Sequence, residues 1–179
     1  MELETQKLKY PIGQFDNHHI FDQSSRDKYI KVLHDFPSKV RLETFALLDW
    51  QLDTPYRDGG WTIRQVVHHC ADSHMNCLTR FKLALTEQTP TIKPYDEALW
   101  AELGDSKMPI NAALKMIEGI HERWVVLLKS LSMDEFKRSF IHPVHNKEIP
   151  LDEALGFYAW HCDHHLAHIV NLKTAKGWK

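Results

Sequence analysis

The 179-residue sequence lacks the marks of several large classes of protein. It has only three cysteines, an odd number without the paired spacing of a zinc motif, so we expect reduced thiols and no disulfide framework. No apolar run approaches the roughly 20 residues that cross a bilayer, and residues 1–10 alternate charges instead of forming a signal segment. These absences favour a cytoplasmic protein with no membrane partner.

The sequence also lacks an excess of either charge. Its 22 lysines and arginines against 24 aspartates and glutamates give a net charge of −2, so nucleic acid is not an expected partner. With seven glycines, eight prolines and 43% hydrophobic residues, the composition is typical of a soluble globular chain. The length suits one domain of roughly 100 to 200 residues, so we expect residues 1–179 to share a single core.

Hydrophobic residues recur with helical spacing through most of the chain. Long helices are predicted at about residues 24–50, 62–86, 109–131 and 151–175, with short helical segments near 96–103 and 132–138. Residues 1–23 have no lasting period and are predicted to form an extended arm, and only residues 140–149 leave room for a short irregular strand pair. The expected fold class is therefore all-α: a four-helix bundle with a long crossover region and short extra helices.

Local signals refine the first two of these helices. Ser24 or Ser25 is the predicted N-cap of the first helix, and Pro37 removes a backbone donor, so we expect that helix to bend there. Thr62 followed by Gln65 has the form of a capping box, which predicts where the second helix begins.

Histidine is the residue that the sequence holds in excess, with 13 copies. On the last predicted helix, His161, His164, His165 and His168 share one inward stripe. His161 and His165 lie four residues apart, so they can point two imidazoles at one metal ion, and His164 with His168 forms an equivalent competing pair. Several buried imidazoles without partners would be costly, and a shared cation resolves that cost for the group.

A third ligand is expected from the second predicted helix, which carries His68 and His69. His69 shares its face with the polar residues Asp72, Asn76 and Arg80, so it borders a polar cavity and not the tightest packing. His69 is the predicted ligand, and His68 is the alternative. A second alternative is that His69 only closes a hydrogen-bond network with Asp72.

Other chemistries are weaker. The sequence has no His-Glu-x-x-His motif, so a carboxylate base beside the ligands is absent. Cys162 is next to His161, but it points about 100° away from the histidine stripe, which favours a packed thiol over a nucleophile or ligand.

The sequence with these histidines resembles a known family, the YfiT group of the DinB-like superfamily. The resemblance covers almost the whole chain and rests on GGWTIRQVVHH at 59–69, PYDE at 94–97 and WHxxHHxAHI at 160–169. It implies a four-helix bundle in which three histidines hold one divalent ion, zinc or nickel. On the motif positions these ligands are His69, His161 and His165, the same three that the helical reading selects.

The resemblance also implies an activity. It predicts a cytoplasmic, homodimeric enzyme acting on a small molecule, either as a metal-dependent hydrolase or as an S-transferase that uses a low-molecular-weight thiol such as bacillithiol. Three neutral imidazoles leave a divalent ion its charge and an open position, which activates water or a thiol as a nucleophile.

Six residues are candidates for supporting roles around this nucleophile. Asn76 and Arg80 lie about 10 and 16 Å along the helix from His69, where they could hold a carboxylate of the thiol. The side chains predicted to orient the ligand imidazoles are Asp72, Tyr158, His164 and His168.

Two rival hypotheses belong to other classes. The first is a non-catalytic metal-binding or stress-response protein whose ion is structural, which requires a fourth protein ligand such as His164, Asp72 or Cys162. The second is a protein-interaction scaffold whose histidine stripe binds no metal.

Overall fold

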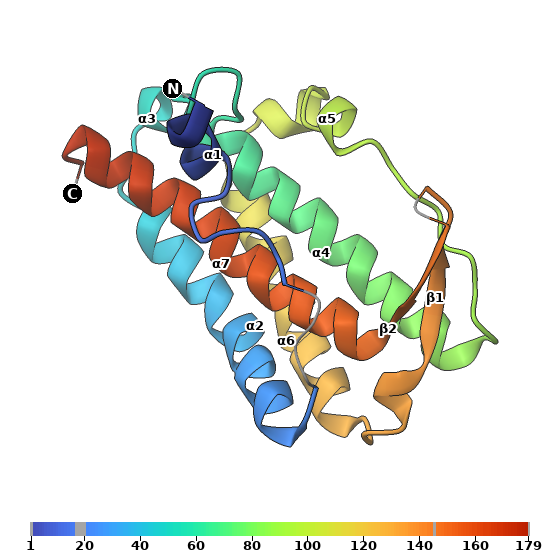
Figure 1. Ribbon diagram of the computed structural model, residues 1–179. Helices are drawn as coiled ribbons and strands as arrows, with labels where there is room; N and C mark the ends of the chain where they lie inside the picture. Colours follow the sequence, from blue (N-terminus) through green and yellow to red (C-terminus); the bar gives the residue numbers. More distant parts are fainter. Residues whose placement is uncertain (1, 17–20, 145, 179) are drawn as a thin grey trace.

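The structure, a computed structural model, describes residues 2–16, 21–144 and 146–178. Four long helices form a bundle (Figure 1): α2 (Gln23–Thr44), α4 (Ile63–Thr86), α6 (Asn111–Ser130) and α7 (Leu151–Lys176). The shorter helices are α1 (Glu2–Lys9), α3 (Asp49–Leu52) and α5 (Glu97–Trp100), with 3-10 turns η1 (Gly104–Lys107) and η2 (Glu135–Lys137). Two antiparallel strands, β1 (Ser139–His142) and β2 (Lys147–Pro150), complete the fold. The predicted four-helix bundle is confirmed.

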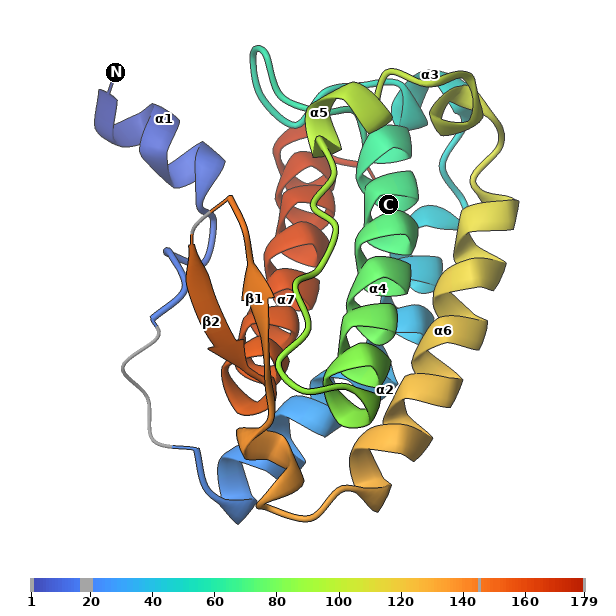
Figure 2. The same ribbon diagram turned by 90° about the vertical axis from the view of Figure 1, so that its right-hand side faces the viewer.

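The long helices pack in a ring that differs from their order in the sequence. Helix α2 packs mainly on α6 and α7, and α4 also packs on α6 and α7. Consecutive helices α2 and α4 are therefore diagonal to each other, as are α6 and α7. This arrangement brings α4 and α7, the two histidine-rich helices, side by side (Figure 2).

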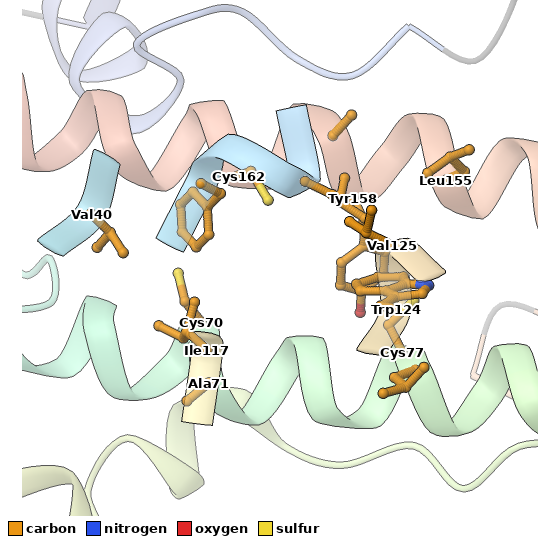
Figure 3. Packing of buried hydrophobic residues seen from close by; sticks show 14 of the residues in the cluster. Val40, Cys70, Ala71, Cys77, Ile117, Trp124, Val125, Leu155, Tyr158 and Cys162 are labelled. Carbon is orange, nitrogen blue, oxygen red and sulfur yellow. The ribbon is translucent and has the colours of Figure 1, made fainter. Parts of the chain in front are cut away.

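The core lies between the four helices and consists mainly of aliphatic side chains, together with aromatic rings and three cysteines. Trp124, Phe36 and Phe81 are among its largest fully buried members. Figure 3 shows Cys70 and Cys162 pointing into this core. Burial raises the pKa of both thiols, so they are packed, protonated groups, as the sequence indicates for Cys162.

Two boundaries of α2 differ from the sequence prediction. Its N-cap is Asp22 and not Ser24 or Ser25, because the Asp22 carboxylate accepts a hydrogen bond from the Ser25 backbone N–H at 2.8 Å. The helix ends at Thr44, before the predicted end at about residue 50, and Phe45, the next residue, is 72% exposed and lies outside the core. The capping box of α4, between Thr62 and Gln65, is confirmed.

Two other segments also differ. Residues 2–9 form α1 where an extended arm was expected, and lysines in its last turn, Lys7 and Lys9, complement the helix dipole. Helix α6 begins at Asn111, two residues after the predicted start at about residue 109. The strand pair at 139–150 fills the room that the sequence left for one.

Residues of the N-terminal segment, of the chain after α4 and of the strand pair lie on the side of the bundle where α4 meets α7. The chain after α4 runs back along that helix towards α5 (Figures 1 and 2), and its Ile92 N–H donates to the Ile141 carbonyl of β1 at 3.0 Å. From the arm, the Gly13 carbonyl accepts a hydrogen bond from Trp160 Nε1 of α7 at 3.1 Å. Among the described residues, no helix combines the length and apolar character needed to span a membrane.

Candidate metal centre

The three predicted ligands meet where α4 faces α7. His69 Nε2 lies 3.2 Å from His161 Nε2. The His165 ring centroid lies 4.8 Å from that of His69 and 4.3 Å from that of His161. One nitrogen of each ring lies within 4.8 Å of the others. The four-residue spacing of His161 and His165 on α7 places both rings on the helix face that meets α4.

The geometry and protonation of this cluster fit a divalent ion. Two imidazole ligands of a tetrahedral ion with bonds of 2.0–2.1 Å lie about 3.3 Å apart, close to the distance between His69 and His161. Burial lowers the pKa of His69 to about 4, and it lowers the pKa of His161 and His165 well below the usual value. All three rings are therefore neutral at pH 7, which is the form that binds a metal.

A cavity of about 740 Å³ opens next to the three rings, which all line it. Trp61, whose ring centroid is 4.6 Å from that of His69, and Tyr158, 5.3 Å from that of His161, form part of the wall. An ion held by the three imidazoles would thus have protein on one side and the cavity on the other. This volume is in the range of small-molecule binding sites.

His68, the alternative third ligand, points elsewhere. Its Nε2 lies 3.1 Å from the Met108 carbonyl oxygen, outside the cluster. The alternative in which His69 bonds Asp72 has no support in the described residues, because no hydrogen bond joins the two side chains there. Asp72 is half-buried, and burial raises the pKa of its carboxyl.

The competing pair, His164 and His168, also comes together. Their Nε2 atoms lie 3.1 Å apart, and His165 is close enough to complete a second group of three. The His164 ring stacks on Trp160 with a centroid distance of 4.5 Å, and the His168 ring stacks on Tyr56 at 3.8 Å. The two histidine groups therefore overlap at His165, and of this pair only His164 lines the cavity.

The remaining predicted site residues separate into two kinds. Tyr158 and Arg80 line the cavity, and the Tyr158 hydroxyl donates to the Ser73 carbonyl at 3.3 Å. Asn76 does not line it, because its side-chain amide donates to the Asp72 carbonyl of its own helix at 2.9 Å. Arg80 therefore lies at the cavity, whereas Asn76 makes a bond within its own helix.

A fourth protein ligand was the sequence criterion for a structural ion. Cys162 Sγ is 4.0 Å from His74 Nε2 and fully buried in the core, outside the cavity. Within the part of the chain that the structure describes, the group around His69 contains three members.

Sequence reasoning missed the role of two buried histidines. His74 Nε2 lies 3.1 Å from His161 Nδ1, and His74 Nδ1 lies 2.7 Å from His121 Nε2. The only sequence signal is a histidine on an otherwise apolar helix face in each case. The contact between α4 and α6 that joins His74 to His121 spans 47 residues, and no local pattern shows it.

A helical bundle that presents three neutral imidazoles to a cavity has the features of a metalloprotein, and comparison with known proteins gives its family. The sequence model of the DinB superfamily matches residues 41–169, so the chain belongs to the DinB superfamily.

Its similar proteins carry names that refer to a metal. The chain is 50% identical over 172 residues to "Putative metal-dependent hydrolase YfiT" of Bacillus subtilis (strain 168), covering 96% of this chain and 97% of that one. It is also 50% identical over 171 residues to a "Putative metal-dependent hydrolase" of Bacillus cereus (strain 03BB102), covering 96% and 98%.

A solved structure agrees with this family, and a second shares the fold. YfiT from Bacillus subtilis, described as "a probable metal-dependent hydrolase with an unusual four-helix bundle topology", matches with a TM-score of 0.94 at 49% identity, over 97% of this chain and 99% of that chain. A mycothiol-dependent maleylpyruvate isomerase shares the fold at 16% identity, with a TM-score of 0.64 over 80% of this chain and 60% of that one.

Proposed function

We propose that this chain is a metal-dependent enzyme that uses one divalent ion, zinc or nickel, to activate a nucleophile. The observation that carries the proposal is the convergence of His69, His161 and His165 from two helices on one wall of the cavity, with two of their nitrogens 3.2 Å apart. Late first-row ions suit a set of three neutral imidazoles.

The residues around the site have separate tasks in this proposal. The three imidazoles hold the ion, and a bound ion supplies the Lewis acidity that makes a water molecule or a thiol nucleophilic near neutral pH. Trp61 and Tyr158 limit access of bulk water to one side of the reacting groups. A bundle wall on the other side keeps the ligand rings fixed.

The charges around the cavity favour an acidic co-substrate. Four cationic side chains and two carboxylates line it: Lys9, Arg57, Arg80 and Lys147 against Glu97 and Glu153. Lys147 is already paired with Glu153 at 2.6 Å. Arg80 is the cation on the helix that carries His69, so it is the residue we assign to a carboxylate of the co-substrate.

A low-molecular-weight thiol fits this environment best. In the transfer reaction the sulfur attacks an electrophilic carbon, a carbon–sulfur bond forms, the leaving group departs with its electron pair, and the thiol proton goes to solvent. The isomerase that shares the fold is named for its dependence on such a thiol, mycothiol, which guides the choice of assay. Hydrolysis, the activity in the names of the 50% identical relatives, is the variant in which water replaces the thiol.

The alternative of a purely structural ion is less well supported. A structural zinc site has four protein ligands, whereas three imidazoles facing a cavity leave a position for a reactant. The homodimer and the cytoplasmic location stay predictions, and light scattering on the purified chain tests the first.

The first experiment is the metal content of tag-free protein by plasma mass spectrometry, with wild type beside His165→Ala. We expect about one zinc or nickel ion per chain in the wild type, and its loss in the variant, because two imidazoles bind a divalent ion far more weakly than three. His34→Ala is the matched control, since His34 is an exposed histidine remote from the site. Metal-free wild type, or metal retained in His165→Ala, contradicts the site.

The second experiment separates the two reactions. Bacillithiol with monochlorobimane reports thiol transfer, and p-nitrophenyl acetate reports hydrolysis, each with and without a chelator. We expect Arg80→Ala to raise the KM for bacillithiol by about tenfold while the metal content is unchanged, as loss of one charge-assisted hydrogen bond implies. An unchanged KM removes Arg80 from the thiol site.

A further inference from the structure

A series of hydrogen bonds, called the relay below, leads from the proposed metal ligand His161 into the core. His161 Nδ1 lies 3.1 Å from His74 Nε2, and His74 Nδ1 lies 2.7 Å from His121 Nε2. At the far end, His121 Nδ1 lies 2.5 Å from the Leu33 carbonyl oxygen. These four residues belong to α7, α4, α6 and α2, so the relay connects all four long helices of the bundle.

The relay ends at the Leu33 carbonyl, which has no helical donor within α2. In a helix, the carbonyl of residue 33 would accept a hydrogen bond from the N–H of residue 37. That residue is Pro37, which has no N–H, so the Leu33 carbonyl lacks its helical donor. His121 supplies the missing donor from the neighbouring helix.

This end point determines which nitrogen of each ring in the relay carries the proton. A carbonyl can only accept, so His121 Nδ1 must carry a proton. His74 and His121 are 0% and 1% exposed, and their printed hydrogen bonds go to histidine rings and a carbonyl, so each ring is a neutral imidazole that holds one proton. His121 Nε2 is therefore bare and accepts from His74 Nδ1.

The same reasoning continues to the metal site. His74 carries its one proton on Nδ1, which donates to His121. Its Nε2 therefore has no proton and accepts from His161 Nδ1. His161 then has no proton on Nε2. That bare nitrogen is the atom 3.2 Å from His69 Nε2 in the proposed ligand group.

The surroundings of the two middle rings leave little room for another proton arrangement. His74 is 0% exposed and His121 1% exposed. Phe36 packs against both, with ring centroids 5.3 and 5.4 Å away, and Trp124 lies 6.0 Å from His121. Figure 3 shows Trp124 and Cys162 in this core, where the Cys162 thiol, a weak donor 4.0 Å from His74 Nε2, is the nearest competitor.

We propose that His74 and His121 are positioning residues that set the tautomer and orientation of His161 before any ion binds. The relay presents the His161 Nε2 lone pair to the cavity, whereas an isolated imidazole would divide its proton between the two nitrogens. The order of protons needs no ion, but its consequence, tighter metal binding, rests on the proposed metal site. Hydrogen bonds to a ligand imidazole change metal affinity by about 10- to 100-fold.

The first test is NMR of the metal-free wild type, in which imidazole nitrogen chemical shifts distinguish protonated from bare nitrogens. We expect a proton on Nδ1 and none on Nε2 in each of His74, His121 and His161, and that pattern supports the relay. A proton on Nε2 of His161 overturns it, whatever the protein binds.

The second test is zinc affinity, measured by competition with a chromophoric chelator in a matched pair of variants. His121→Leu removes the acceptor for His74, so we expect affinity to fall by about 10- to 100-fold. His121→Gln keeps a side-chain oxygen that can accept from His74, so we expect affinity within about threefold of wild type. Equal affinity in wild type and His121→Leu, with the variant folded by circular dichroism, overturns the positioning role.

Other outcomes remain decisive. If His121→Leu does not fold, the NMR of the wild type and the zinc affinity of His74→Gln against His74→Leu judge the relay in the same way. If the wild type binds no zinc or nickel, the proposed function fails, while the NMR result still decides whether the proton order is right.

Discussion

His161 and His165 are one helical turn apart on α7 and equally buried at 7% exposure, yet their surroundings differ. The Nδ1 of His161 is bonded to His74, which is bonded in turn to His121. The Nδ1 of His165 is buried and, among the described residues, has no hydrogen-bond partner. The two predicted ligands of one motif thus differ: hydrogen bonds orient the ring of His161, and only packing orients the ring of His165.

The packing around His165 consists of other rings. Trp61 lies nearly parallel to it at a centroid distance of 6.4 Å, and His164 meets it edge-on at 5.0 Å. Such contacts restrict the plane of the ring without choosing which nitrogen is protonated. We therefore expect the tautomer of His161 to be fixed before an ion binds, and the tautomer of His165 to be fixed only when an ion binds.

The largest expected effect is the stabilisation of the folded chain by the ion itself. At a zinc concentration about 1,000 times its Kd, binding raises the free energy of unfolding by about 4 kcal/mol. We expect calorimetry to show a higher Tm for wild type with zinc, and no zinc effect for His161→Ala or His165→Ala. Here the two ligands should behave alike, because each removes one of three bonds; a zinc-dependent Tm in either variant breaks that equivalence.

The pH dependence of stability should report on His121, at the core end of the hydrogen-bonded histidines. The pKa of His121 in the folded chain is about 4, against about 6.5 in the unfolded chain, so between these values only the unfolded chain takes up its proton. The stability is present above pH 6.5 and is lost as the pH falls towards 4, with a slope of about 1.4 kcal/mol per pH unit for this one group.

Urea unfolding of metal-free protein between these pH values measures that slope. We expect the slope to be smaller in His121→Gln than in wild type, since glutamine does not titrate. A slope that is the same in wild type and His121→Gln means that His121 is already protonated, or exposed, in the folded chain.

A smaller effect should separate the two ligands directly, in metal-free protein. His161→Ala removes the donor to the buried Nε2 of His74, and leaving such a group unsatisfied costs about 1–3 kcal/mol beyond the lost packing. His165→Ala removes a ring whose Nδ1 had no partner, so we expect the smaller loss of stability there. Urea unfolding with a chelator present compares them, and a larger loss in His165→Ala contradicts the asymmetry.

The sequence predicted the grouping of His69, His161 and His165 better than it predicted the hydrogen bonds behind that group. Positions four apart on one helix share a face whatever the tertiary fold, so the pairing of His161 with His165 is a local property. The choice of His69 over His68 followed from the polar residues on its face. Both inferences need only the period of a helix, and the structure brings these residues together.

The relay depends on information that no local pattern holds. Whether His74 meets His121 is decided by α4 packing on α6, and helix packing in a bundle is set by the whole core. Pro37 was recognised as a break in the helical hydrogen bonds, but the sequence could not show that His121, 88 residues from Leu33, supplies the missing donor. The predicted end of α2 near residue 50 was wrong for a similar reason: Phe45 is 72% exposed, and apolar spacing alone does not show which residues are buried.

The smallest expected effect concerns the second histidine group, His164 and His168, which shares His165 with the first. If the ion is held by His69, His161 and His165, then His168→Phe keeps the stacking on Tyr56, removes only the bond to His164, and should change zinc affinity by less than about threefold. Chelator competition measures this, with His161→Ala as the variant expected to lose the ion. Loss of zinc in His168→Phe and its retention in His161→Ala would move the metal site one turn along α7, onto a pair that no relay orients, and the proposed link between core and metal would have no ligand to act on.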